Sequence, residues 1–293
     1  MNIFSGLEEI VKAKHPMAKH TWYGIGGEAD YYITPRNVEQ LKDVAKRCNE
    51  NEVPIYVLGF GSNLLISDNG VRGAVIKLES DEFKKIEFHD DKITAWAGAE
   101  LSKLVLECVE KGLSGIECLT GIPGSIGGSV RMNAGGSFGD IAAAIESVSL
   151  MDYKGEVFEK SKPELMFDYR HSNITAKYIL NAKLQLSKGD PDQILRNVKE
   201  VWIYKKNHQP LNTRNSGCIF KNPRGMAAGA LIDRAGLKGL QVGKAQVSEK
   251  HANFIIAHEG CSSHDVLTLI ENIQKRVREQ FEVELEREIE IWE

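Results

Sequence analysis

Apolar residues recur every three or four positions in four stretches of the chain, which is the spacing of one face of an α-helix. These stretches are residues 38–48, 101–109, 194–206 and 264–281. The second stretch ends at Lys111 and Gly112, a basic residue followed by a glycine, as helix C-termini commonly do. We therefore predict four amphipathic helices.

Short apolar or alternating runs lie between the predicted helices, and we expect them to form strands. They cover residues 54–58, 64–66, 75–78, 86–97, 178–186 and 288–292. Residues 146–159 read as a hairpin around the turn at residues 152–155. Ser161 and Glu164 have the spacing of a capping box at the start of a short helix. Helices and strands do not alternate regularly, so the pattern indicates an α+β fold.

Two segments are rich in glycine. Residues 59–64 follow a predicted strand, and residues 115–136 contain seven glycines in 22 positions. The second segment has no charged residue between Glu117 and Arg131 but includes several apolar ones, unlike a flexible linker. Glycine permits positive φ and a close approach of backbone amides to a ligand. We interpret the segments as a binding surface for a flat, phosphate-bearing ligand such as a flavin; tight structural loops are the alternative.

Composition narrows the class of protein. The net charge of −4 and pI of about 6.1 argue against a protein that coats nucleic acid. Five cysteines with no CxxC pair indicate neither a disulfide framework nor a zinc site, and we expect no bound metal. The N-terminal residues lack the apolar region of a signal peptide, and no apolar run is long enough to span a membrane. We expect a cytoplasmic protein, a monomer, with no membrane or nucleic-acid partner.

The glycine segments carry a resemblance to a known family. GFGSNLL at residues 59–65 and GIPGSIGGSVRMNAGG at residues 121–136 resemble FAD-binding segments of the UDP-N-acetylenolpyruvoylglucosamine reductase (MurB) family, in its shorter subclass without a tyrosine loop insertion. Further similar motifs include residues 167–170, 216–223, 247–254 and 285–289. The resemblance implies a two-part FAD-binding region of the vanillyl-alcohol-oxidase/PCMH type, followed by a C-terminal α+β substrate-binding domain. We expect the FAD-binding subdomains at residues 1–79 and 80–190, and the substrate-binding domain at residues 191–293.

The resemblance also implies the reaction and its ligands. NADPH would reduce FAD, and the flavin would reduce the enolpyruvyl ether of UDP-N-acetylglucosamine enolpyruvate to give UDP-N-acetylmuramate, a peptidoglycan precursor. The residues expected at the cofactor are Tyr23, Gly24, Ile25, Gly26, Gly59, Gly61, Ser62, Asn63, Leu64, Gly121, Ile122, Pro123, Gly124, Ser125, Gly127, Gly128, Asn133, Ala134 and Gly135. Those expected at the substrate are Tyr169, Lys221, Asn222 and His251.

Three residues are expected to be catalytic by the same resemblance. Arg170 would polarise the substrate carboxylate, because a guanidinium remains charged and its donors match a carboxylate. Cys218 would donate a proton to C2 of the substrate, and a thiol is more acidic than the serine hydroxyl that the family more often has there. Glu288 would assist in stabilising the enolate. Taken singly, each residue has a plainer interpretation: a surface arginine, a small buried thiol and one of several solvated acids.

Two departures and two alternatives accompany this interpretation. His208 stands where we expect a lysine that binds the substrate phosphate, although Lys205 and Lys206 lie nearby. The chain also lacks, after Ser172, the long loop with a substrate-clamping tyrosine. One alternative function is a flavin oxidase of the same superfamily, and the other is a nucleotide-sugar binding protein without catalysis.

Overall fold

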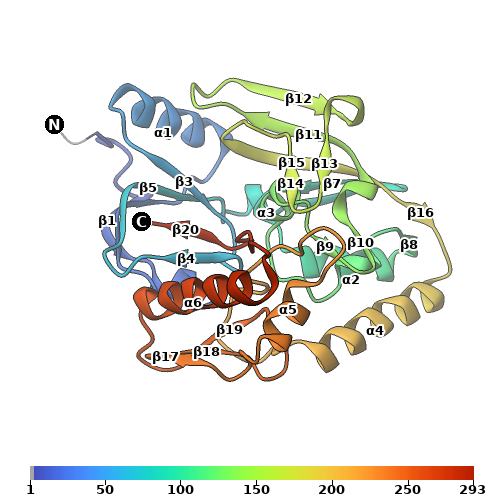
Figure 1. The fold of residues 1–293 in the computed structure, drawn as a ribbon. Coiled ribbons are helices and arrows are strands. Elements are labelled where there is room, and N and C mark those ends of the chain that lie inside the picture. The colour runs from blue at the N-terminus through green and yellow to red at the C-terminus, as the bar shows by residue number, and fades with distance from the viewer. Residues whose placement is uncertain (1–2) are drawn as a thin grey trace. The chain divides into compact units, whose positions relative to one another are not determined.

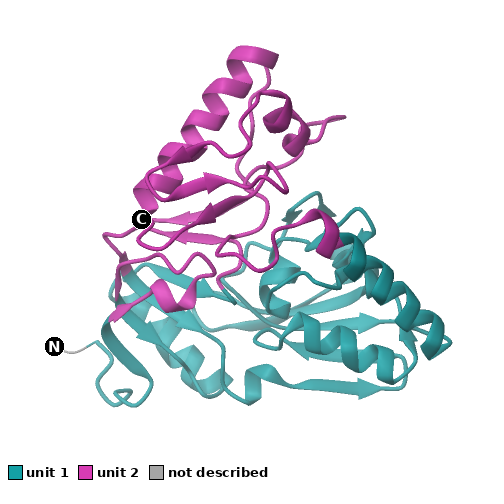
Figure 2. Ribbon diagram, turned by 90° about the horizontal axis from the view of Figure 1, so that it is seen from below, with its two compact units in different colours: residues 1–14, 30–60, 73–204 teal, residues 15–29, 61–72, 205–293 magenta. Residues whose placement is uncertain are grey.

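The computed structural model describes residues 3–293 and divides the chain into two compact units. Unit 1 comprises residues 1–14, 30–60 and 73–204, and unit 2 comprises residues 15–29, 61–72 and 205–293 (Figure 2). The chain therefore passes repeatedly from one unit to the other. The division into three parts at residues 79 and 190 stays a prediction.

Unit 1 contains most of a four-stranded sheet (Figure 1). Its strand order is β1 (Val11–Pro16), β2 (Glu28–Ile33), β5 (Val71–Lys77) and β3 (Ile55–Leu58). The ends of β1, β2 and β5 belong to unit 2. Helix α1 (Val38–Glu50) connects β2 to β3, which pairs parallel with β5. Its N-cap residue Asn37 accepts a hydrogen bond from the Gln40 N–H at 2.9 Å, which satisfies one of the first free amides of the helix.

The second sheet of unit 1 has five antiparallel strands. Their order is β12 (Val157–Ser161), β11 (Ile145–Met151), β15 (Tyr178–Gln185), β7 (Lys92–Trp96) and β6 (Ile86–His89). Its helices are α2 (Leu101–Glu110), α3 (Ile126–Arg131) and most of α4 (Pro191–His208). The shorter elements are β8 (Leu113–Ser114), β9 (Gly135–Gly136), β10 (Gly139–Asp140), β13 (Phe167–Asp168), β14 (His171–Ser172) and β16 (Ser187–Lys188), with 3-10 turns η2 (Glu82–Lys84), η3 (Glu117–Leu119), η4 (Ile141–Ala144) and η5 (Lys162–Glu164).

Unit 2 combines small sheets with one long helix. Strand β4 (Leu64–Ile66) pairs parallel with the last strand, β20 (Glu290–Trp292). Strands β17 (Gln241–Val242), β18 (Ala245–Val247) and β19 (Ile255–Ala257) form an antiparallel sheet. Helix α6 (Ser263–Phe281) contacts β17 and β18, and α5 (Ala228–Arg234) contacts α6 (Figure 1). The 3-10 turn η1 (Ala18–His20) lies before the first glycine turn.

Each unit has a hydrophobic core of its own. The core of unit 1 gathers the buried faces of α1, α2 and the five-stranded sheet, with Leu41, Leu104 and Val148 fully buried. The core of unit 2 forms between α5, α6 and the β17–β19 sheet, with Ile232, Leu269 and Ile255 fully buried. Burying such a side chain contributes about 1.5–3 kcal/mol, so each unit has its own source of stability.

Most of the elements predicted from the sequence are confirmed. The four amphipathic helices correspond to α1, α2, α4 and α6, and the predicted hairpin is β11–β12. The capping box at Ser161 and Glu164 is present, although the helix it starts is only the 3-10 turn η5. Strand β20 is shorter than expected and begins at Glu290, because the N–H groups of Glu288 and Ile289 donate to the Ile219 carbonyl at 2.8 and 3.4 Å.

The sequence did not predict helix α3 inside the second glycine segment. Glycine is a poor helix former, so Gly127 and Gly128 argued against a helix there. Ser125 caps the helix by accepting a hydrogen bond from the Gly128 N–H at 3.3 Å. The Gly127 N–H also donates to the Ala97 carbonyl at 2.9 Å, and a Cβ at Gly127 would lie 2.9 Å from the Ala97 Cβ. Tertiary packing therefore requires glycine in this helix.

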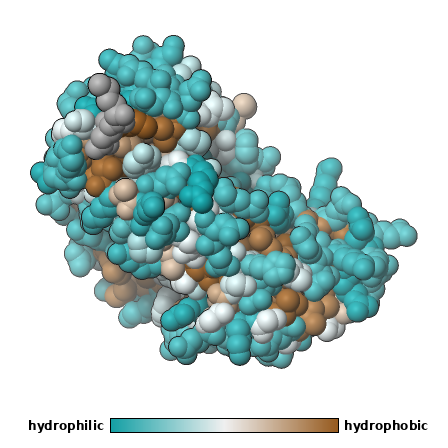
Figure 3. Space-filling view, turned by 90° about the vertical axis from the view of Figure 1, so that its left-hand side faces the viewer, coloured by the Kyte–Doolittle hydropathy of each residue, from teal (hydrophilic) through white to brown (hydrophobic). Residues whose placement is uncertain are grey.

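The face in Figure 3 is mostly hydrophilic, and apolar side chains are exposed in separate places. In residues 3–293 no helix is long and apolar enough to cross a membrane. All five cysteines lie in this range, and none forms a disulfide. The same range contains no cluster of three side chains that would bind a metal ion.

Candidate active site

The residues predicted for the site are distributed over both units. Unit 1 contains Gly59, Gly121, Ile122, Pro123, Gly124, Ser125, Gly127, Gly128, Asn133, Ala134, Gly135, Tyr169 and Arg170. Unit 2 contains Tyr23, Gly24, Ile25, Gly26, Gly61, Ser62, Asn63, Leu64, Cys218, Lys221, Asn222, His251 and Glu288. Each group is described within its own unit.

In unit 1 the two glycine segments meet. A Cβ at Gly59 would lie 2.7 Å from the Ser125 Oγ, so the end of β3 and the N-cap of α3 are in close contact. The Gly124 carbonyl accepts a hydrogen bond from the Leu101 N–H at 3.0 Å, which ties the same segment to the start of α2. Two segments separated by more than 60 positions in sequence therefore form one surface.

In unit 2 the turn at residues 23–27 packs on residues 61–70. The Trp22 N–H donates to the Gly61 carbonyl at 3.0 Å, and the Gly27 N–H donates to the Ser67 carbonyl at 2.9 Å. Gly61 has φ +64°, and a Cβ there would lie 2.1 Å from the His20 carbonyl oxygen. Only glycine meets both conditions, so the backbone conformation of the first glycine segment depends on its residue type.

The glycine segments fit a flavin nucleotide. In residues 3–293 no hydrogen-bond acceptor pairs with the N–H groups of Gly59, Gly61 and Gly124. Unpaired backbone amides in glycine-rich segments suit an anionic group such as a pyrophosphate. Tyr23 differs from the others, because its side chain is only 1% exposed and packs in the core of unit 2. Its backbone is therefore the part that remains for a cofactor contact, while burial raises the pKa of its hydroxyl.

Arg170 lies beside the second glycine segment, in unit 1. Its Nη2 donates to the Gly135 carbonyl at 2.8 Å, and its guanidinium lies 5.0 Å from the centre of the Tyr169 ring. Arg170 occupies the turn between β13 and β14 with φ +55°, an uncommon conformation for a residue other than glycine. The turn thus places a cation at the edge of the predicted FAD-binding surface of this unit.

Cys218 and Glu288 lie on paired segments of unit 2. The Glu288 N–H donates to the Ile219 carbonyl at 2.8 Å, and the Lys221 N–H donates to the Glu286 carbonyl at 2.8 Å. Both Cys218 and Glu288 are half-buried. The Asn63 side chain donates to the Glu288 carbonyl at 3.0 Å, which connects this pair of segments to the first glycine segment. Residues separated by 225 positions in sequence are therefore neighbours.

Asn253 fixes the segment that bears Cys218, which the sequence did not reveal. Its side chain is 3% exposed, and its amide accepts from the Phe220 N–H at 3.0 Å and donates to the Phe220 carbonyl at 2.8 Å. The Asn253 carbonyl also accepts from the Ile219 N–H at 2.9 Å. Both ends of the amide are used on backbone, so Asn253 acts on the position of this segment.

The predicted substrate residues of unit 2 already have protein partners. Lys221 forms an ion pair with Glu286, and Asn222 accepts a hydrogen bond from the Ala228 N–H at the start of α5 at 2.9 Å. The Nδ1 of His251 accepts from the Asn253 N–H at 3.3 Å. Burial, aided by the positive charges of Lys238 and His208, lowers the pKa of His251. The imidazole is therefore neutral at neutral pH.

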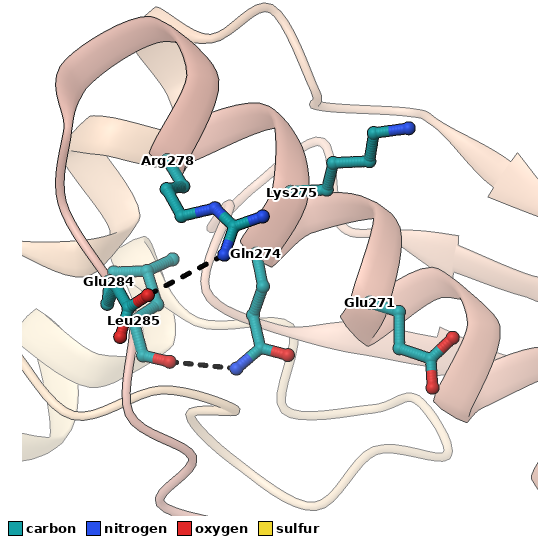
Figure 4. Close-up of a pocket in the computed structure, with 6 residues that line it drawn as sticks. All are labelled: Glu271, Gln274, Lys275, Arg278, Glu284 and Leu285. Atoms are coloured by element: carbon teal, nitrogen blue, oxygen red, sulfur yellow. Dashed lines mark hydrogen bonds and ion pairs between the residues drawn. The ribbon is translucent and has the colours of Figure 1, made fainter.

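A surface depression of about 310 Å³ lies elsewhere in unit 2, on α6 and the segment that follows it (Figure 4). Its lining residues are Glu271, Gln274, Lys275, Arg278, Glu284 and Leu285. The Gln274 side chain donates to the Leu285 carbonyl at 2.8 Å, and Arg278 pairs with Glu284 at 3.6 Å. None of the predicted site residues lines it, and four of its six lining residues contact one another in pairs.

Two family models match the chain. Residues 29–161 match the FAD binding domain, and residues 209–292 match the C-terminal domain of UDP-N-acetylenolpyruvoylglucosamine reductase. The reductase of that name from Clostridioides difficile is 42% identical over 293 residues, covering 99% of this chain and 95% of the relative. The one from Clostridium tetani is 41% identical over 283 residues, covering 96% and 92%.

Solved structures agree with these matches. The crystal structure of UDP-N-acetylenolpyruvylglucosamine reductase from Thermus caldophilus has a TM-score of 0.82 and 38% identity, covering 97% of this chain and 98% of that one. The glucose dehydrogenase Phl p 4.0202 has a TM-score of 0.51 at 15% identity, covering 65% of this chain and 45% of that one. The second likeness concerns the fold alone. The FAD-binding fold, the glycine segments that fit a flavin and the near full-length identity together establish that the chain belongs to the UDP-N-acetylenolpyruvoylglucosamine reductase family, as a FAD-containing, NADPH-dependent oxidoreductase of peptidoglycan precursor synthesis.

Proposed function

We propose that this chain reduces the enolpyruvyl ether of UDP-N-acetylglucosamine enolpyruvate to UDP-N-acetylmuramate, with Arg170, Cys218 and Glu288 as its catalytic residues. The observation that carries the assignment is the backbone pairing of the Cys218 and Glu288 segments within unit 2. The Asn63 side chain ties this pairing to a glycine segment that fits FAD. A candidate proton donor and a candidate acid thus lie on neighbouring segments next to the cofactor residues of that unit.

When bound, FAD would supply the redox chemistry, the transfer of a hydride from NADPH to C3 of the enolpyruvyl group. The protein residues proposed to bind it are Tyr23, Gly24, Ile25, Gly26, Gly59, Gly61, Ser62, Asn63, Leu64, Gly121, Ile122, Pro123, Gly124, Ser125, Gly127, Gly128, Asn133, Ala134 and Gly135. The unpaired amides among them are donors for the pyrophosphate.

Arg170 is proposed to bind the carboxylate of the substrate. Addition of hydride at C3 leaves negative charge at C2, delocalised into that carboxylate. A guanidinium is charged at every relevant pH and stabilises charge as it develops. One Nη2 hydrogen bond to the Gly135 carbonyl orients the group.

Cys218 is proposed to protonate C2 from its thiol, which completes the addition of a hydride and a proton across the double bond. The resulting thiolate recovers a proton from water before the next turnover. A positioned acid contributes about 10²–10⁴-fold in rate. Glu288 is proposed to be protonated or to relay a proton during turnover, because a carboxylate beside an enolate would repel it.

The remaining assignments concern the substrate and the state of the protein. We propose that Tyr169, Lys221, Asn222 and His251 bind the nucleotide-sugar or its carboxylate. We also propose that the chain is a cytoplasmic monomer of the shorter subclass. Lys205 and Lys206, near His208, are the candidate cations for the substrate phosphates.

The Cys218 assignment is tested by two substitutions in the FAD-bound protein. Cys218→Ala leaves the reduction of FAD by NADPH nearly unchanged and slows reoxidation by the enolpyruvyl sugar about 10²–10⁴-fold. Cys218→Ser retains substantial activity, because a hydroxyl can also donate a proton. Both half-reactions are measured by anaerobic stopped-flow absorbance of the flavin. An equal loss in both half-reactions, or an inactive serine variant, rejects the role of Cys218 as proton donor.

A further inference from the structure

Arg131 joins the glycine segment to the hairpin that bears Arg170. It is the last residue of α3 and the charged residue that ends the uncharged part of the glycine segment. Its Nη1 donates to the Ile174 carbonyl, and its Nη2 donates to the Ala176 carbonyl at 2.6 Å and to the Lys177 carbonyl at 3.2 Å. One guanidinium therefore binds three backbone carbonyls of the short segment that follows β14.

The surroundings of this guanidinium are unusual for an arginine. No carboxylate in the described residues 3–293 pairs with Arg131, and burial lowers its pKa. Lys177 is close enough that Arg131 adds to the lowering of its pKa, after burial. The charge of Arg131 is thus compensated by backbone carbonyls alone. A buried charge without an anion costs free energy unless it is fully hydrogen-bonded, so its carbonyl contacts are tightly specified.

The hairpin itself needs such contacts. Its two strands share only two residue pairs, Phe167 with Ser172 and Asp168 with His171. A two-stranded hairpin of this size is not stable alone in water. The side chains at and before its turn face solvent, with Met166 69% and Tyr169 45% exposed.

Two further hydrogen bonds fasten the hairpin to the same end of α3. The Ser172 hydroxyl donates to the Arg131 carbonyl at 2.9 Å, and the Asn133 side chain donates to the Asp168 carbonyl at 3.0 Å. The Arg131 guanidinium therefore binds the segment that follows β14, while the Arg131 backbone carbonyl accepts from Ser172 within β14. Arg170, between these anchors, bonds to Gly135, four positions after Arg131.

We infer that Arg131 is a positioning residue for the reduction of the substrate, because it fixes the hairpin that presents the guanidinium of Arg170. The inference rests on the proposed role of Arg170 at the substrate carboxylate. Arg131 acts through Arg170 and is not among the residues proposed to bind FAD or to donate the proton. Its loss therefore affects the second half-reaction and leaves the reduction of FAD by NADPH unchanged.

The test compares half-reactions in FAD-bound variants by anaerobic stopped-flow absorbance. Arg131→Met slows flavin reoxidation by the enolpyruvyl sugar about 10- to 100-fold, the range expected when a reacting group is displaced by about an ångström. Flavin reduction by NADPH changes less than about twofold. Arg131→Lys preserves the charge but loses the fork, so its reoxidation rate lies between the rates of Arg131→Met and the unchanged protein. If Arg131→Met does not fold, the reoxidation rate of Arg131→Lys provides the test.

Arg47→Met is the matched control in the same unit. Arg47 also donates to backbone carbonyls, those of Ile3 at 3.2 Å and Ser5 at 2.7 Å, but it lies on α1 and makes no contact with the hairpin. Its substitution lowers stability and leaves both half-reactions unchanged. A purely structural role for Arg131 would give the same pattern as this control, and that result overturns the inference.

A double-substitution cycle separates the inference from the proposal beneath it. Arg170→Ala alone slows reoxidation about 10²–10³-fold if it stabilises the developing charge. In that background Arg131→Met adds less than about a further twofold, because the residue through which it acts is gone. Full additivity of the two substitutions overturns the role of Arg131. An unchanged reoxidation rate in Arg170→Ala alone rejects the role of Arg170 instead.

Discussion

The two units position their proposed catalytic residues by different means. In unit 1, Arg170 lies in a short exposed hairpin that is fastened by side chains, mainly Arg131 and Asn133. In unit 2, the segment of Cys218 is paired along its backbone with that of Glu288 and bonded at its centre by the buried amide of Asn253. The group proposed to bind the substrate carboxylate thus lies on a side-chain-anchored turn, whereas the proposed proton donor lies on a segment that is part of a core.

Two buried asparagines make this comparison testable, since each is 3% exposed and bonds to backbone. Asn253→Ala has the larger effect, because it leaves the N–H and carbonyl of the buried Phe220 without their partner. An unsatisfied buried polar group costs about 1–3 kcal/mol, so the free energy of unfolding falls by about 2–4 kcal/mol. The flavin reoxidation rate falls as well, since Cys218 lies two residues before Phe220 on the same segment. Urea unfolding of the FAD-bound protein and stopped-flow absorbance measure the two effects.

Asn272→Ala is the control for that experiment. Asn272 is exposed on α6, and replacing it changes the free energy of unfolding by less than about 0.5 kcal/mol. If Asn253→Ala resembles this control, the amide does not stabilise the Cys218 segment and the contrast between the units is lost.

Asn133→Ala in unit 1 has a smaller effect. Its side chain donates to the carbonyl of Asp168, an exposed residue, so water can replace that bond. Asn133 also has φ +45°, a conformation that costs alanine about 1 kcal/mol more than asparagine. We expect a loss of about 1–2 kcal/mol of unfolding free energy by the same urea measurement. A loss equal to or above that of Asn253→Ala would reverse the comparison.

The smallest predicted effect concerns pH. Because burial lowers the pKa of His251, the unfolded chain binds a proton there more readily than the folded one. Stability from this group is full above the usual histidine pKa of about 6.5 and is lost as the pH falls through the lowered value. Between about pH 7.5 and about pH 5.5, the urea midpoint should fall further for the unchanged protein than for His251→Asn. Equal changes would mean that His251 is not held neutral by the fold.

The sequence predicted the elements whose signals are local. The periodic apolar positions of α1, α2, α4 and α6 were sufficient because each face repeats within one segment. Helix α3 was missed because its Gly127 is required by contact with Ala97, which no local pattern reveals. The glycine segments were recognised from the sequence. Their contacts within each unit were not, because these contacts join residues that are far apart in sequence.

The supporting residues of the site escaped prediction for the same reason. Asn253 bonds to Phe220 across 33 positions, and Arg131 bonds to Ile174 across 43. Neither residue type is unusual where it stands, so only the fold reveals their partners. The catalytic assignments of Arg170, Cys218 and Glu288 came from the family resemblance and stay predictions.

The central claim is that bound flavin in this chain transfers electrons from NADPH to an enolpyruvyl UDP-sugar. Its most direct test is the visible absorbance of the purified protein under anaerobic conditions, with NADPH added first and UDP-N-acetylglucosamine enolpyruvate second. We expect a yellow protein that NADPH bleaches and that only the enolpyruvyl sugar recolours. A colourless preparation that cannot be loaded with FAD, or a bleached flavin that the sugar leaves reduced and only oxygen recolours, would contradict the account.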